Sequence, residues 1–196
     1  MKKVIIMCIA IIMLATACTN KSEVKNVKEE GFYKFELLSS YDECIKILKS
    51  KNWGYKVTKL HDQHGNGVVV TVDKIISIDG KRLSLELVFP DTLSVNNRFI
   101  DFNSKALVKF SYSVRNIDAD YAQSFIKYCN KYFGEPKLNQ FANEVSKDFD
   151  PKVVSWNDNN YNIICVTYLG KNDINLIDIE FGMTNNQEKM ALEKFK

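Results

Sequence analysis

The sequence predicts an α+β fold: a tandem repeat of a capped helix followed by an antiparallel β-meander, with the helices packed on one face of the sheet. Three observations predict it. Helix signals recur in two similar segments, SYDECIKILKSKNWGYK and DYAQSFIKYCNKYFGEPK. The strands that follow each segment alternate apolar and polar residues and are joined by short turns, which is typical of antiparallel sheets. One constant offset aligns Tyr41 with Tyr121 and Gly54 with Gly134, and such internal repetition indicates a duplicated unit.

The two helices are expected near 40–51 and 120–133. Ser40 begins a capping-box pattern with glutamate three residues later, and Asp120 begins a similar pattern that ends in glutamine. We also expect Asp118 to cap the second helix or to complement its dipole. Each helix carries an apolar stripe at helical spacing, so each is expected to bury one face.

Turns and strands follow in order along both units. Gly54 and Gly134 are expected to take the left-handed conformation at the helix ends. Turns are expected at Asp79-Gly80, Asn159-Asn160, Gly65-Asn66-Gly67 and Gly170-Lys171-Asn172-Asp173. Strands are expected over 32–38, 55–60, 68–78, 82–89, 105–114, 153–156, 161–169 and 174–181. A last helix, capped by Thr184 with Gln187, is expected to end at Phe195.

The N-terminus has the features of an exported protein. Two lysines precede an apolar run from Val4 to Ala15, which fits the core of a signal peptide and is shorter than the roughly 20 residues that span a bilayer. The sequence Leu14-Ala15-Thr16-Ala17-Cys18 resembles a bacterial lipobox. This resemblance implies cleavage before Cys18 and lipidation of its thiol and amine. A plain secretory signal cut near Ala17 is the alternative.

These features divide the chain into a signal peptide at 1–17, a lipidated cysteine and flexible tether at 18–30, and two α+β units at 31–117 and 118–196. The tether is polar and lacks hydrophobic patterning. The expected location is the bacterial cell envelope, with the lipid on Cys18 in the outer membrane and the protein facing the periplasm. Two or more acyl chains anchor a protein stably, whereas a single chain does not.

A tandem of helix plus antiparallel meander resembles the β-lactamase-inhibitor-protein-like fold. A capped helix before a hairpin, behind a lipobox, is also similar to small OmlA/SmpA-type outer-membrane lipoproteins. In the inhibitor family each repeat has its own disulfide. Here Cys44, Cys129 and Cys165 do not stand at repeat-equivalent positions, so no inhibitory residue is carried over. We expect all three to be small buried residues rather than reactive thiols, although an oxidising compartment allows two of them to pair.

Composition and motifs exclude several functional classes. The chain carries a formal net charge of +3 and has only Arg82, Arg98 and Arg115 as arginines, which argues against nucleic-acid binding. The two histidines, His61 and His64, lie close together with one carboxylate between them, but a zinc site needs further ligands. We therefore expect no metal, no cofactor and no enzymatic activity. One alternative function is a hydrolase that uses His61 or His64 on a loop. A second alternative is a carrier that holds a small molecule or glycan in the concavity of the sheet.

One asymmetry between the repeats points to a binding surface. The strand at 82–89 carries Ser84 and Glu86 away from its helix, whereas the matching strand places Ile164, Val166 and Tyr168 there. Large exposed apolar patches are uncommon on monomers. We expect this face to be covered either by residues 184–196 or by a partner. We expect the protein to be a non-enzymatic binding or envelope-assembly accessory, with a possible envelope protein partner.

Overall fold

The structure, a computed structural model, describes residues 31–62, 65–95, 98–103, 105–139, 152–170 and 175–195. In chain order the elements are α2 (Tyr41–Ser50), β1 (Lys56–Asp62), β2 (Gly65–Ile78), β3 (Lys81–Pro90), β4 (Thr92–Val95), β5 (Arg98–Asp101), β6 (Lys109–Arg115), α3 (Ala119–Phe133), β7 (Leu138–Asn139), β8 (Lys152–Asn157), β9 (Asn162–Leu169), β10 (Asn175–Gly182) and α4 (Asn185–Lys194). The expected signal peptide, Cys18 and the expected tether lie outside the described residues.

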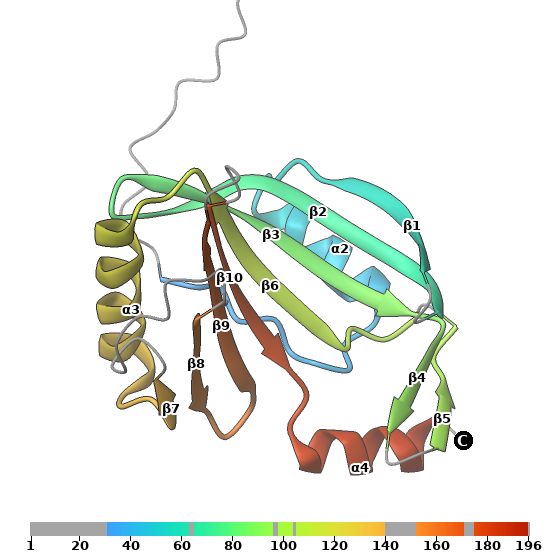
Figure 1. Cartoon of the computed structure of the whole chain (residues 1–196). Coiled ribbons are helices and arrows are strands. Elements are labelled where there is room, and N and C mark those ends of the chain that lie inside the picture. The colour runs from blue at the N-terminus through green and yellow to red at the C-terminus, as the bar shows by residue number, and fades with distance from the viewer. Residues whose placement is uncertain are drawn as a thin grey trace, which may run out of the picture.

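The fold is a mixed α+β arrangement around one large antiparallel sheet (Figure 1). Eight strands follow the order β1-β2-β3-β6-β10-β9-β8-β7, and β4 pairs with β5 in a separate hairpin. The central strands β6 and β10 pair antiparallel, with Phe110 opposite Phe181 and Tyr112 opposite Ile179. On one side of this pair lie α2 and the strands β1 to β3, and on the other lie α3 and the strands β7 to β9.

Both helices pack against the same face of the sheet, which we call the covered face. Tyr41 of α2 contacts Phe89 of β3, with ring centroids 5.3 Å apart. Phe125 of α3 contacts Phe32, whose ring in turn lies 5.8 Å from that of Phe181 on β10. The buried apolar residues of both helices and of this face belong to one core. Burying this aromatic and aliphatic surface is the main force that holds the two halves together.

The expected strand at 32–38 is not a strand. This segment runs over the covered face, and its carbonyl groups accept hydrogen bonds from tyrosine hydroxyls of the sheet. Tyr112 donates to the carbonyl of Tyr33 at 2.6 Å, and Tyr161 donates to that of Phe35 at 2.9 Å. Phe35 and Leu37 are buried there. The alternating apolar residues of the segment fill the core, and its backbone is held by these two side chains and by a hydrogen bond from the N–H of Leu38 to the carbonyl of Leu107 rather than by a strand ladder.

The helix caps agree largely with the sequence. The capping box that begins at Ser40 is present at α2, and the one that begins at Thr184 is present at α4, which ends at Phe195 as expected. The cap of α3 is Asp118, whose carboxylate accepts a hydrogen bond from the backbone N–H of Tyr121. The capping box expected at Asp120 is therefore wrong, because the helix begins two residues earlier than a cap at Asp120 requires.

The glycine prediction is correct at one helix end and wrong at the other. Gly134 caps α3 with a φ of 84°. After α2 the left-handed residue is Asn52, with a φ of 56°, and Gly54 lies beyond it. Asparagine tolerates this conformation better than most residues, so Asn52 can end the helix without a glycine.

The turns between strands also differ between the two halves. Asp79-Gly80 forms the expected two-residue turn between β2 and β3, with both φ angles positive. The turn that contains Asn159-Asn160 is longer, because Asn157 pairs with Asn162, and the carboxylate of Asp158 accepts from the backbone N–H of Asn160. The expected turn at 65–67 is wrong, since these residues belong to β2. Gly67 is required there because a Cβ would lie 2.6 Å from the carbonyl oxygen of Phe89.

Candidate functional site

The face of the sheet opposite the helices, which we call the open face, carries the residues that the sequence selects for binding. Ile164, Val166 and Tyr168 alternate along β9 with residues of the core. Ile164 has 41% of its surface exposed, and Val166 and Tyr168 are partly exposed. The three residues therefore share one face of one strand, as the alternation predicts.

The C-terminal helix does not cover these residues. Phe195, at the end of α4, contacts Phe102 with ring centroids 4.8 Å apart, and Ala191 is fully buried in the core. Figure 1 shows α4 at the end of the sheet, beside the β4–β5 hairpin. The expectation that residues 184–196 cover Ile164 is therefore wrong. Phe195 instead packs on Phe102, in the long connection between β3 and β6, and Met190 of α4 is exposed.

Charged residues adjoin the apolar residues of β9 on the open face. Glu180 of β10 lies opposite Ile164 in the register, and its carboxylate forms an ion pair of 2.7 Å with Lys109 of β6. Asp178 of β10 lies opposite Val166. On β3, Glu86 is exposed and lies opposite Ser111. The open face thus changes from apolar on β9 to acidic on β10, whereas β3 carries both Arg82 and Glu86 there.

Asp178 is the most strongly perturbed acid of this face. The pKa of its carboxyl is raised to about 6, chiefly by burial. A hydrogen bond from Ser111 and the charge of Lys109 act to lower this pKa, and the charges of Glu180 and Glu86 act to raise it. Its Oδ1 atom is buried and has no hydrogen-bond partner among the described residues. A carboxylate without full solvation or pairing is costly, so the neutral form is favoured until nearly neutral pH.

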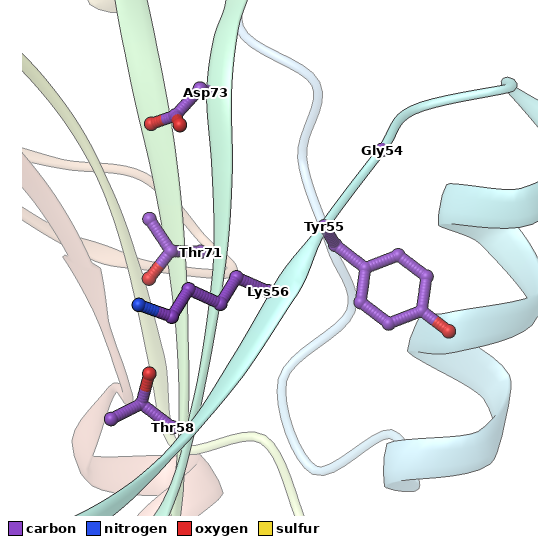
Figure 2. A pocket seen from close by; sticks show the side chains of 6 residues that line it. All are labelled: Gly54, Tyr55, Lys56, Thr58, Thr71 and Asp73. Carbon is purple, nitrogen blue, oxygen red and sulfur yellow. The ribbon is translucent and has the colours of Figure 1, made fainter.

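A second surface feature lies at the edge strand β1, where a hollow of about 610 Å³ opens between β1, β2 and the chain before β1. Figure 2 shows Lys56, Thr58, Thr71 and Asp73 on one side of the two strands, while Tyr55 points the other way. On the opposite side of β1, a hollow of about 410 Å³ with mainly apolar walls is lined by Ser40, Tyr41, Asp42, Val57, Val68 and Lys105.

A third hollow is a polar cleft of about 930 Å³ beside α4. It lies between residues 36–39, the turn at 159–161 and the exposed side of α4, and carboxylates and amides make up much of its wall. The covered face of the sheet is filled by core side chains such as Phe110 and Phe181. A carrier function would therefore use this cleft rather than the covered face.

The residues considered for chemistry are placed as follows. His61 lies in β1 and pairs with Asn66 in the register. The side chain of His61 and the whole of His64 lie outside the described part of the structure. Cys44, Cys129 and Cys165 are free and buried, as expected. Burial raises the pKa of the Cys44 thiol to about 12 and raises that of the other two thiols as well. Thiols in this state are poor nucleophiles.

Within the described part of the chain, no group of three or more histidines, cysteines and acidic residues is arranged to hold a metal ion. No helix in that part is long and apolar enough to span a bilayer.

Sequence reasoning missed the hollows at β1 and the buried state of Asp178. The signal for Asp178 was its position between two buried isoleucines of a strand, but its surroundings depend on β3 and β6. The exposure of β1 had no signal in the sequence, because Val57 continues an ordinary alternating pattern. Only the order of the strands shows that β1 is an edge.

Comparison with known proteins gives one match. No curated protein and no solved structure matches the chain. The family model described as the TP0088 domain matches residues 30–180, which is well over half of the 196 residues. The chain therefore belongs to the TP0088 domain family.

Proposed function

We propose that the protein is a membrane-anchored lipoprotein of the bacterial envelope that works without enzymatic activity and binds another envelope protein through its open face. The observation that carries the binding proposal is the exposure of Ile164 and its neighbours on β9, where the matching strand β3 is polar. An exposed apolar group on a structured sheet favours a partner, because burying each large side chain contributes about 1.5–3 kcal/mol.

The charges beside this group define the partner. On β10, next to β9, the open face carries Asp178 and Glu180, and Lys109 of β6 pairs with Glu180, so a partner with an apolar patch and a basic group that reaches Asp178 fits best. The Oδ1 atom of Asp178 has no hydrogen-bond partner among the described residues, and a cationic donor of a partner would supply one.

The test compares two variants of similar exposure. Ile164→Asp alters the open face, and Val57→Asp alters β1, where Val57 is 45% exposed compared with 41% for Ile164. Protein carrying each change is captured from its native envelope after cross-linking, and co-captured proteins are identified by mass spectrometry. A partner that is retained by the wild type and by Val57→Asp but lost from Ile164→Asp supports the proposal. Equal capture by all three proteins contradicts it, provided that circular dichroism shows each to be folded.

Anchoring through Cys18 is a separate proposal with its own measurement. Mass spectrometry of the native N-terminus should show an acylated chain that begins at Cys18. An unmodified chain that begins elsewhere would contradict the lipoprotein assignment and would leave the proposal for the open face unaffected.

We also propose that residues 31–117 and 118–196 are two copies of one helix-plus-meander unit. The equal order of elements around the central pair β6–β10 supports this, as does the alignment of Leu85 with Cys165 on the covered face. α2 with β3 should superpose on α3 with β9 at these matched residues. A superposition that matches other residues would contradict the duplication.

The alternatives have distinct tests. A hydrolase would lose activity when His61 and His64 are both changed to alanine, whereas a binding protein would keep its partner. A small-molecule carrier is favoured by the polar cleft beside α4. Native mass spectrometry of protein purified from its envelope would reveal a bound ligand there.

A further inference from the structure

We propose that an aromatic patch at the start of the described chain lies on the surface of an anionic lipid bilayer, so that the helices face the membrane and the open face points away from it. This aromatic patch consists of Tyr33, Trp53, Tyr55 and Tyr132, with Lys51 and Lys131 beside them. The inference rests on the proposed anchoring through Cys18 and adds an orientation that anchoring alone does not give.

The first support is the place at which the described chain begins. Gly31 packs so closely on Tyr132 that a Cβ atom there would overlap the tyrosine hydroxyl. In Figure 1 the described chain begins beside α3 and runs across the sheet to α2. Residues 18–30 separate Cys18 from Gly31, and a flexible chain of this length, as the sequence predicts, spans about 20 Å on average. The surface around Gly31 is therefore the part of the folded body that the lipid holds nearest to the bilayer.

The second support is the continuity of the aromatic patch between the two helices. Phe32 is buried, and its ring lies 6.2 Å from that of Tyr132 on α3. The next residue, Tyr33, has its ring 6.0 Å from that of Trp53, which follows α2. Figure 2 shows Tyr55 on the side of α2. The patch therefore connects the ends of both helices on the helix side of the sheet.

The rings of the aromatic patch have one buried part and one part in water. Tyr132 is 49% exposed and Tyr55 is 36% exposed, whereas Tyr33 and Trp53 are half-buried and pack against the core. Tyrosine and tryptophan combine an apolar ring with a polar tip, and this is why both are enriched at the level of the lipid headgroups. The exposed parts of these rings are thus suited to an interface that is apolar on one side and wet on the other.

Lysines accompany the aromatic patch. The ammonium group of Lys51 lies 4.4 Å from the ring centroid of Tyr33 and 5.2 Å from that of Trp53. Residues 44–56 contain four lysines and no acid, and residues 121–134 contain two lysines and no acid. Lysine side chains lie along an apolar surface with the ammonium group in water, so they can reach lipid phosphates beside buried rings.

The acids of both helices lie at the ends remote from the patch. Asp42 and Glu43 stand in the first turn of α2, and Asp120 stands in the first turn of α3. Trp53 and Tyr132 instead lie at the C-terminal ends, where Lys49, Lys51 and Lys131 also stand. Glu135 follows α3, and Asp158 is neutralised by its ion pair of 2.6 Å with Lys34. Positive charge therefore prevails at the patch, which favours an anionic bilayer.

The resulting orientation is compatible with the partner proposed for the open face. Both α2 and α3 pack on the covered face, whereas Ile164 is exposed on the opposite face of the same sheet. A molecule that rests on its helix side would present Ile164 away from the lipid, where another envelope protein can reach it.

The test uses Trp53 as a native reporter. The chain has two tryptophans, and Trp156 is 1% exposed in the core, so Trp156→Phe leaves Trp53 alone. The mature chain that begins at Cys18 is coupled through this thiol to a maleimide phospholipid in vesicles of phosphatidylcholine and phosphatidylglycerol. The other three cysteines of the mature chain are buried, so they are protected from the coupling. Because the coupling replaces the native lipid, failure of acylation in the cell and failure of this proposal are distinguishable.

Lipids brominated near the carbonyl end of their acyl chains quench tryptophan fluorescence on contact. We expect brominated phosphatidylcholine to lower the fluorescence of the Trp156→Phe variant about twofold, since Trp53 would lie at headgroup level. The control carries Trp53→Phe, Trp156→Phe and Phe99→Trp. Position 99 is 82% exposed on β5, at the other end of the sheet from α3 (Figure 1), and its tryptophan should keep its fluorescence.

Further changes in the Trp156→Phe background test the lysines. Lys51→Glu combined with Lys131→Glu should reduce the quenching to that of the control, because anionic lipid then repels the patch. Lys105→Glu combined with Lys189→Glu changes two exposed lysines outside the patch and should leave the quenching unchanged. Ile164→Asp should also leave it unchanged, which separates this orientation from partner binding at the open face.

Three results would overturn the proposal for proteins that circular dichroism shows to be folded. The first is equal quenching at Trp53 and at position 99. The second is quenching at Trp53 that survives reversal of both patch lysines. The third is a dimer, seen by light scattering without vesicles, in which the emission of Trp53 is already shifted to the blue. In that case a second copy, and not a bilayer, would cover the aromatic patch.

Discussion

β3 and β9 occupy corresponding places beside the central pair β6–β10, and they agree on one face and differ on the other. On the covered face, Leu83 and Leu85 of β3 and Ile163 and Cys165 of β9 are all fully buried. On the open face, β3 carries Ser84 and Glu86, whereas β9 carries Ile164 and Val166. In both halves, packing of the core requires apolar residues on the covered face. The open face is not required by packing, so its apolar character on β9 needs another explanation, and partner binding provides one.

The largest effect is expected on the covered face. Leu85→Ala should lower the free energy of unfolding by about 2–5 kcal/mol, because the truncation removes buried methyl groups and leaves a cavity. Ser84→Ala, the neighbouring residue on the open face, should change it by less than about 0.5 kcal/mol. Urea unfolding of both variants measures the difference. Equal effects at the two positions would contradict the assignment of the faces.

The next effect concerns Asp178 and depends on pH. The folded protein raises the pKa of this carboxyl from its ordinary value of 3.8 to about 6. The unfolded chain therefore loses the proton first, so stability falls as the pH rises between about 4 and 6 and stays low above that window. Asp178→Asn removes this titration and should be more stable than the wild type at pH 7 by about 1–3 kcal/mol.

Thermal unfolding of both proteins at several pH values between 3 and 8 measures this prediction. The difference between the variant and the wild type should grow through the window and then remain constant. A difference that is independent of pH would show that the pKa of Asp178 is the same in the folded and the unfolded chain.

A smaller effect is expected at Thr167, which stands on the covered face of β9 where β3 has Leu87. Thr167 is 1% exposed, and its hydroxyl has no hydrogen-bond partner among the described residues. Thr167→Val keeps the shape and removes the unpaired hydroxyl, so it should raise the free energy of unfolding by about 1 kcal/mol. Chemical denaturation checks this, and a loss of stability would show that the hydroxyl has a partner in solution.

The smallest change in stability is expected when the open face of β3 is transferred to β9. The variant Ile164→Ser, which takes the residue of the matching position Ser84, should alter the free energy of unfolding by less than about 1 kcal/mol, since Ile164 is 41% exposed. It should nevertheless lose the envelope partner. Unfolding curves and cross-linked capture are measured on the same preparations. Retention of the partner would contradict the proposal that the apolar residues of β9 bind it.

The local elements were determined largely by the sequence itself. The capping residues Ser40 and Thr184 fix the starts of α2 and α4, because their hydroxyls satisfy backbone N–H groups within the same turn. Alternation assigned the covered and open residues of β3 and β9 correctly, because a strand has only two faces. Asp79-Gly80 set a tight turn because both residues tolerate positive φ angles.

Tertiary structure decided everything that depends on which segments meet. The segment 32–38 alternates like a strand but does not join the sheet. The hydroxyls of Tyr112 and Tyr161 donate hydrogen bonds to two of its carbonyls. α4 has an apolar stripe, but the contact of Phe195 with Phe102 places it away from Ile164. β1 became the exposed edge only through the order of the strands. Local patterns encode which side of an element is apolar, whereas the identity of its neighbour follows from how the whole chain fills one core.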